Sequence, residues 1–118
     1  MISAEPVRAE RQYVLSLYRI ERARGCRAAV AWANVARRAR LGLGSLQNIV
    51  RNRVKKIDGQ VRDRLQALLI REIEAEIARW IHELELARQG SARFAGERVG
   101  EAEAHLEALK ALMREAGR

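Results

Sequence analysis

The chain has 118 residues and a formal net charge of +8, and 48% of its residues are hydrophobic. This length suits one ordinary domain and leaves little room for two separate cores. One proline, eight glycines and five aromatic residues are few for a β-rich protein with many turns and strands. Alanine, leucine, glutamate and arginine dominate instead, as they do in helices, so we predict an all-α fold.

The distribution of apolar residues predicts neither a membrane-spanning segment nor a secretion signal. The longest uninterrupted apolar run, residues 28–33, is far shorter than the roughly 20 residues of a membrane-spanning helix. Residues 1–12 carry several charges and lack the apolar core of a secretion signal. Cys26 is the only cysteine, so no internal disulfide can form. We therefore expect a cytoplasmic protein with no membrane partner.

Charge is distributed unevenly along the chain. Residues 1–64 hold 15 Lys and Arg against five acids, a net of +10, whereas residues 65–118 hold eight against ten, a net of −2. Between Glu21 and Asp58 there are ten basic residues and no acid. Such a block attracts a polyanion, and nucleic acid is the commonest one, because each neutralised phosphate releases condensed counterions.

Three helices are predicted in the first half of the chain. Pro6 suits a first helical turn, and apolar residues then follow at helical spacing until Gly25, a natural stop. Residues 27–40 contain neither Gly nor Pro and predict a second helix, which places near one face Val30, Val35, Ala36 and Ala39. The run 41–44 breaks the pattern, and apolar residues resume in a short third helix at Leu46, Ile49 and Val50.

The second half predicts two longer helices. Asp58 is a good N-cap, and residues 60–89 again lack Gly and Pro, which predicts a helix of roughly 45 Å. Residues 98–116 predict a last amphipathic helix whose apolar residues follow steps of three and four. These two helices should form a helical hairpin or a dimerisation region.

The apolar pattern of the long helix divides the chain after residue 69. Up to that point the apolar arc is wide and should close the core under the earlier helices, giving a helix-turn-helix domain over 1–69. Residues 70–118 form a helical dimerisation region continuous with it, in which a coiled-coil seam has steps of four and three. The predicted dimer interface consists of Ile73, Ile77, Trp80 and Leu84.

The segment WANVARRARLGLGSLQNIVRNR, residues 32–53, has the spacing of a helix-turn-helix. Small Ala36 lets the two helices approach closely, and Leu41 fills the turn. Leu46 and Ile49 fix the second helix against the first.

In this register the segment resembles the DNA-binding motif of the lambda repressor/Cro-like (XRE-type) family, and the resemblance covers residues 27–69. The matching positions are Val35-Ala36, Leu41, Leu46, Ile49 and Asn52-Arg53. Arg40 stands where the family usually has a turn glycine, and we expect Gly42 or Gly44 to take the left-handed backbone angles instead. Gly42 also stands where Ser or Thr usually opens the recognition helix. The resemblance implies a recognition helix over about residues 43–52.

If Leu46 and Ile49 point inward, helical geometry sends a set of polar side chains outward. The predicted base-reading residues, suited to hydrogen bonds in the major groove, are Ser45, Gln47, Asn48 and Arg51. The predicted phosphate-binding residues, which position the protein without reading sequence, are Arg37, Arg38, Asn52, Arg53, Lys55 and Lys56.

No set of residues predicts catalysis, a metal site or a cofactor. We interpret Cys26 as a small buried hydrophobe with no acid or His beside it, and His82 and His105 as surface or interface residues without metal-ligand spacing. Glu72 and Glu76 share a helix face and are interpreted as a solvated stripe. There is no glycine-rich phosphate loop and no evident small-molecule ligand. We therefore expect that the protein is not an enzyme.

Two functions remain open. The first is a phage-repressor-type transcriptional regulator, associated with the nucleoid, that binds palindromic double-stranded DNA as a homodimer with its recognition helices one DNA turn apart. The second is a helical assembly or adaptor protein, such as a small phage DNA-packaging subunit or a protein that binds a regulator. A closed higher oligomer would favour the second function.

Overall fold

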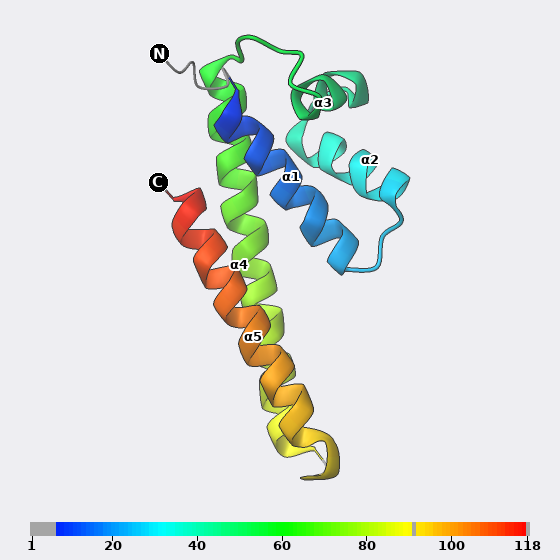
Figure 1. Ribbon diagram of the computed structural model, residues 1–118, viewed down its shortest axis with the longest axis vertical. Helices are drawn as coiled ribbons and strands as arrows, with labels where there is room; N and C mark the ends of the chain where they lie inside the picture. The colour runs from blue at the N-terminus through cyan, green and yellow to red at the C-terminus, as the bar shows by residue number, and fades with distance from the viewer. Residues whose placement is uncertain (1–6, 91, 118) are drawn as a thin grey trace. The chain divides into compact units, whose positions relative to one another are not determined.

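The computed structural model describes residues 7–90 and 92–117, with side chains for residues 7–90 and 96–117 (Figure 1). All the secondary structure in these ranges is helical, which confirms the all-α prediction. The helices are α1 (Arg8–Ala23), α2 (Ala28–Ala39), α3 (Leu43–Val50), α4 (Gly59–Gln89) and α5 (Ala92–Ala116). None of the helices in these ranges is both long and apolar enough to cross a membrane.

The predicted start of the last helix was wrong. α5 begins at Ala92 rather than Arg98 and runs through Gly96 and Gly100. A helical glycine costs only about 1 kcal/mol relative to alanine, and the surrounding residues are strong helix formers, so the helix continues through both.

Contacts between Cα atoms divide the chain into an amino-terminal unit, residues 1–69, and a carboxy-terminal unit, residues 70–118. The boundary falls within α4, so the first turns of α4 belong to the amino-terminal unit and the remainder to the carboxy-terminal unit. The charge asymmetry follows this division, because residues 65–69 carry no charge and the two units keep formal charges of +10 and −2.

The amino-terminal unit has a core supplied by one face of each helix. α1 packs against α2 and α3 and buries Val14 and Leu17, and the small Ala31 and Ala36 are buried on α2. Val30 was predicted on this face but is 48% exposed, and Ala31 takes the inward position instead. The other buried apolar side chains are Val7, Tyr13, Ile20, Val35, Ala39, Leu46, Ile49, Leu65, Leu68 and Leu69.

The first three helices end in the same way, with one residue in the left-handed region. Gly25, Arg40 and Asn52 have φ of 94°, 57° and 58°. After α2, the N–H of Arg40 donates to the carbonyl of Arg37 (3.2 Å) and the N–H of Leu41 donates to that of Ala36 (2.9 Å). Equivalent pairs follow α1 and α3, so each helix ends in a Schellman motif.

The predicted stop at Gly25 is thus confirmed, but the expectation that Gly42 or Gly44 takes the left-handed angles was wrong. Gly42 is the extended N-cap of α3 (φ −65°, ψ 149°), and Gly44 lies inside the helix. The chain must reverse directly after Ala39 so that Leu41 can return to its half-buried position. This requirement places the strained angles on Arg40.

Asp58 caps α4 as predicted. Its carboxylate accepts a hydrogen bond from the N–H of Gln60 (2.8 Å), which satisfies one of the free donors in the first turn.

The carboxy-terminal unit is a helical hairpin in which residues 70–89 of α4 and the helix α5 run antiparallel (Figure 1). The Trp80 indole stacks on the His105 imidazole with ring centroids 4.4 Å apart, and Arg88 pairs with Glu103 at 3.6 Å. Ala87 of α4 and Ala102 and Leu106 of α5 are buried along the hairpin. The predicted seam of α4 is therefore met by the last helix of the same chain.

We expect the substitution Arg40→Gly to stabilise the protein. The left-handed conformation costs a non-glycine residue roughly 1–2 kcal/mol, and glycine avoids this steric cost. Part of the gain is offset because glycine loses more conformational entropy on folding. The net gain should be about 1 kcal/mol in the free energy of unfolding, measured by urea denaturation with an unchanged m-value.

Arg40→Ala is the matched control for the loss of the charged side chain. Alanine retains the steric cost of the left-handed angles, so this variant should gain nothing. Equal stabilisation by both substitutions would show that charge repulsion, and not backbone strain, governs this turn.

Candidate nucleic-acid interface

Helix α3 has a polar outer face and an apolar inner face. Leu46 and Ile49 are buried, as predicted from their spacing. Of the predicted base-reading residues, Ser45, Asn48 and Arg51 are exposed and Gln47 is half-buried. Within the described ranges, the side chains of these four residues make no hydrogen bond or ion pair. Their donors and acceptors are therefore free for a ligand.

The carboxyl end of α3 is held by a residue that the sequence analysis did not single out. The Nε of Arg11, on α1, donates to the Val50 carbonyl at 2.8 Å. This contact satisfies one of the last carbonyls of α3 and places a cation at the negative end of the helix dipole. Arg11 and Val50 are 39 positions apart, so no local pattern could have paired them.

A small recess lies between α2 and α3. It has a volume of about 130 Å³ and is lined by Trp32 of α2, by Gln47 and Val50 of α3, and by Arg51. The Trp32 ring stacks on the Tyr18 ring of α1, with centroids 4.0 Å apart and an interplanar angle of 15°. The recess thus has an apolar, ordered wall and a polar rim that includes two of the predicted base-reading residues.

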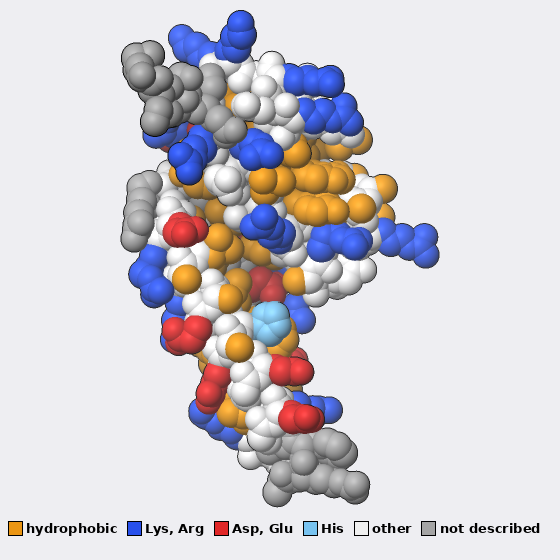
Figure 2. All heavy atoms as spheres, viewed as in Figure 1, with side chains coloured by type: hydrophobic (Ala, Val, Ile, Leu, Met, Phe, Trp, Pro, Cys, Tyr) orange, Lys and Arg blue, Asp and Glu red, His pale blue; other side chains and the backbone are white. Residues whose placement is uncertain are grey.

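The predicted phosphate-binding residues do not form one uniform set. Arg37, Asn52, Arg53, Lys55 and Lys56 are exposed. Basic side chains gather over the amino-terminal unit, whereas acidic ones lie along the hairpin (Figure 2). Asn52 supplies the left-handed residue that ends α3, so it has a backbone role as well. Arg38 differs from the others, because its Nη1 lies 2.8 Å from Oε1 of Glu21.

Glu21 is the centre of a buried polar cluster between α1 and α2. Its carboxylate pairs with Arg38 of α2. It also pairs with Arg24, three residues further along the chain, at 3.4 Å. Its second oxygen accepts hydrogen bonds from Asn34 Nδ2 (3.2 Å) and from Cys26 Sγ (3.4 Å). Sequence reasoning missed this cluster, although Glu21 is the only acid between Glu10 and Asp58 and stands next to arginines.

The interpretation of Cys26 as a buried hydrophobe without a neighbouring acid was wrong. The side chain is half-buried, and its thiol donates to the Glu21 carboxylate. Partial burial and the adjacent carboxylate raise the pKa of the Cys26 thiol above its ordinary value, despite the opposing effect of Arg24 and Arg38. The thiol is therefore a neutral donor at pH 7, which is the opposite of an activated nucleophile.

The four predicted interface residues of the hairpin occupy different environments. Ile73 is fully buried and Trp80 stacks on His105, so both are occupied within the fold. Ile77 and Leu84 are half-buried, and Ile81, which was not predicted, is 45% exposed. Ile77, Ile81 and Leu84 follow steps of four and three, so they share one flank of α4.

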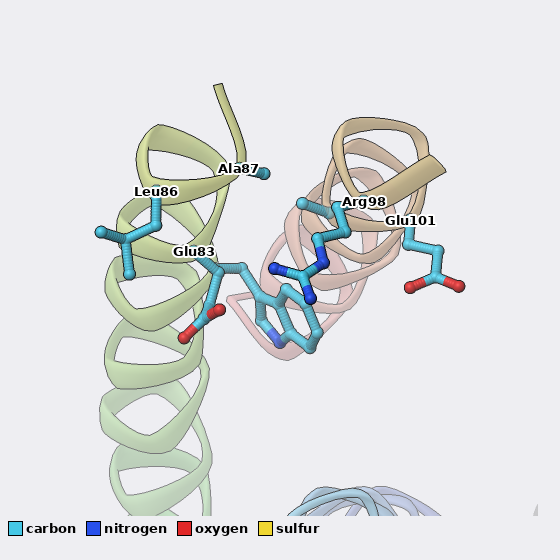
Figure 3. Close-up of a pocket in the computed structure, with 7 residues that line it drawn as sticks. Glu83, Leu86, Ala87, Arg98 and Glu101 are labelled. Carbon is cyan, nitrogen blue, oxygen red and sulfur yellow. The ribbon is translucent and has the colours of Figure 1, made fainter. Parts of the chain in front are cut away.

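An open pocket lies on the hairpin, with a volume of about 360 Å³. Figure 3 shows the guanidinium of Arg98 reaching from α5 toward α4, where Glu83 also lines the pocket. Leu86 also lines this pocket and is 49% exposed. The guanidinium of Arg79 lies 5.3 Å from the centroid of the Trp80 ring. The pocket combines acidic, basic and apolar groups without a buried polar group directed into it.

The interpretation of Glu72 and Glu76 as a solvated stripe was wrong for Glu76. This residue is buried, and its carboxylate pairs with Arg79 at 3.3 Å. The pairing neutralises the charge locally, so Glu76 serves the structure of the helix.

The raised pKa of Cys26 predicts a pH dependence of stability. A thiol whose pKa is raised on folding contributes stability below its unfolded pKa of about 8.5, and the contribution is lost as the pH rises through the folded value. Urea denaturation at pH 8 and pH 10 should therefore show a larger alkaline loss for the natural chain than for Cys26→Ser. The serine hydroxyl retains the hydrogen bond and does not titrate in this range. An identical loss in both chains would contradict the assigned hydrogen bond to Glu21.

Comparisons with protein-family models, curated proteins and solved structures gave no match for this chain. Its function is therefore inferred from the geometry of α3 and of the hairpin.

Proposed function

We propose that this protein binds double-stranded DNA by inserting α3 into the major groove, and that it acts as a sequence-specific transcriptional regulator. The observation that carries the proposal is the outer face of α3, where the free side chains of Gln47, Asn48 and Arg51 stand on a helix held from behind by Leu46 and Ile49. Amide side chains pair with adenine and arginine forks onto guanine in the major groove. The resemblance to XRE-type motifs agrees with this role.

Gly44 supports a close approach of a ligand to α3. It lies in the first turn of the helix, is exposed, and has no heavy atom within 4 Å of the position that a Cβ would occupy. Neither backbone angles nor packing inside the protein therefore requires glycine at this position. A missing side chain on the outer face brings the helix backbone nearer to the floor of a groove.

The charge of the amino-terminal unit supports a polyanionic partner. Arg37, Arg53, Lys55 and Lys56 are exposed cations on the same unit as α3 and are suited to phosphates. Arg38 pairs with Glu21 in the buried cluster, so we assign it to the packing of α2 rather than to a phosphate.

We propose that the protein binds DNA as a homodimer formed by the hairpin. The flank defined by Ile77, Ile81 and Leu84 leaves apolar surface uncovered. A second copy suits it because the unit has a formal charge of only −2 and its mixed charges do not repel a copy strongly. A two-fold dimer would present two α3 helices to half-sites about 34 Å apart. Association with the nucleoid follows from this function.

The second candidate, a helical assembly or adaptor protein, is favoured by the same exposed apolar flank. In that case the hairpin is the functional part, and the chain forms a closed higher oligomer, as in a small DNA-packaging subunit, or binds a regulator. The mass in solution distinguishes a dimer from a ring, and a narrow footprint distinguishes sequence reading from loose DNA binding.

We expect the affinity for duplex DNA to fall steeply with salt concentration. Four phosphates neutralised in each subunit give a slope of about −3.6 per subunit in a plot of log K against log salt. Asn48→Ala or Arg51→Ala should cost about 1–3 kcal/mol on the preferred site and leave non-specific binding nearly unchanged. The measurement is a fluorescence-anisotropy titration of a selected site and of an unrelated duplex.

Lys55→Ala and Lys56→Ala are the matched controls, because a lost phosphate contact weakens all sequences about equally. If they behaved like Asn48→Ala, α3 would not be the reading helix. A chain that binds no duplex, or binds independently of salt, contradicts DNA binding altogether.

For the dimer, we expect Ile81→Glu to give a monomer in light scattering. The substitution places a charge in the centre of the apolar flank, and Ile81 is exposed in the single chain, so the fold should tolerate it. Binding to a palindromic site should weaken with the loss of the second half-site.

Leu86→Glu is the matched control, since Leu86 is equally exposed but lies on a different side of α4. This variant should remain dimeric. A dimer that survives Ile81→Glu excludes this flank as the interface.

A further inference from the structure

The recess between α2 and α3 has the composition of a site for a small apolar group next to hydrogen-bonding groups. Trp32 and Val50 supply its apolar wall, and Gln47 and Arg51 supply its polar rim. Its volume of about 130 Å³ accommodates a methyl group and the ring edge that carries it. The recess belongs entirely to the amino-terminal unit.

The apolar wall is held in place from behind. Trp32 is stacked on Tyr18, and the carbonyl of Val50 accepts the hydrogen bond from Arg11. Both contacts come from α1, which also packs against α2 and α3. The wall is therefore preorganised, so a ligand would not have to pay for ordering it.

The polar rim points outward and is free. Gln47 and Arg51 are one helical turn apart on the same side of α3, and neither side chain has a partner within the described ranges. In the major groove, two such side chains suit the hydrogen-bonding groups of a base pair, and the recess suits an apolar group on the neighbouring base pair. The only apolar group on a base edge in this groove is the C5-methyl of thymine.

We propose that Trp32 and Val50 receive the 5-methyl group of a pyrimidine, normally thymine, while Gln47 and Arg51 bind the base pair next to it. The proposal rests on the proposed DNA binding by α3 and adds to it the base that the apolar wall selects. Arg11 is then a positioning residue, since it acts through Val50 and touches no base.

The test begins with a preferred site selected from a random duplex library, in which each thymine is replaced in turn by deoxyuridine. Deoxyuridine keeps the base pair and lacks only the methyl group. At one thymine position in each half-site, replacement by deoxyuridine should lower the affinity of the protein for the duplex about fourfold. This factor corresponds to the burial of one methyl-sized group. Cytosine and 5-methylcytosine at the same position separate the methyl group from the rest of the thymine base. The methylated base should bind more tightly by a similar factor.

Val50→Ala should bring the thymine-to-deoxyuridine ratio close to one, because it removes half of the apolar wall. Arg51→Ala should keep the ratio and lose discrimination at the neighbouring base pair. Val30→Ala is the matched control, since Val30 is an exposed valine of α2 outside the recess and should leave the ratio unchanged. Circular dichroism confirms that each variant is folded.

Three results would overturn the proposal. If the chain binds a specific site but no deoxyuridine substitution weakens binding, or if Val50→Ala leaves the ratio unchanged, the recess does not read a methyl group and DNA binding by α3 still stands. If the chain binds no duplex at all, the proposed function fails together with this inference.

Discussion

The buried carboxylate of Glu21 is the contact on which the arrangement of the first three helices depends. A carboxylate removed from water is costly unless it is paired and hydrogen-bonded, and Glu21 satisfies this condition with Arg38 and Asn34 of α2 and with Cys26 of the connecting loop. These partners are available together only when α2 lies in one position against α1. Apolar packing between small residues such as Ala31 and Ala36 tolerates sliding, whereas a charged network with defined donors does not.

The position of α3 follows from that of α2 through a short turn. Only residues 40–42 separate the two helices, and the left-handed Arg40 sets the direction in which the chain leaves α2. An eight-residue helix is too short to be stable alone in water, so α3 depends on this turn, on its buried Leu46 and Ile49, and on the contact from Arg11. These contacts hold the buried side of α3, and its polar side chains are left on the opposite face.

In the hairpin, α5 covers only part of the apolar stripe of α4. The seam of α4 demands a partner helix, and α5 supplies one, with Trp80 stacked on His105. The stripe is wider than one partner helix can cover, because Ile77, Ile81 and Leu84 extend along its flank. Residual apolar surface of this kind is a common basis of self-association.

Features that depend on neighbours in the chain could be predicted from the sequence. Helical periodicity predicted each of the five helices in the described ranges, although not the start of α5, and the inward direction of Leu46 and Ile49, because side chains three and four residues apart share a face. Local signals also located the cap at Asp58 and the stop at Gly25. The outward placement of Ser45, Asn48 and Arg51 followed from the same geometry.

The contacts between groups far apart in the chain could not be predicted in this way and depend on the fold. Periodicity shows that a seam needs a partner but cannot say whether α5 or a second chain provides it. It cannot show that Arg38 pairs with Glu21, that Arg11 reaches the Val50 carbonyl, or that Trp32 and Val50 enclose a recess beside Gln47. The left-handed angles at Arg40 also required the fold, since steric preference favours glycine there and the return of Leu41 to its half-buried position overrides that preference. Local energies select helices, but the contacts that orient them depend on distances through space.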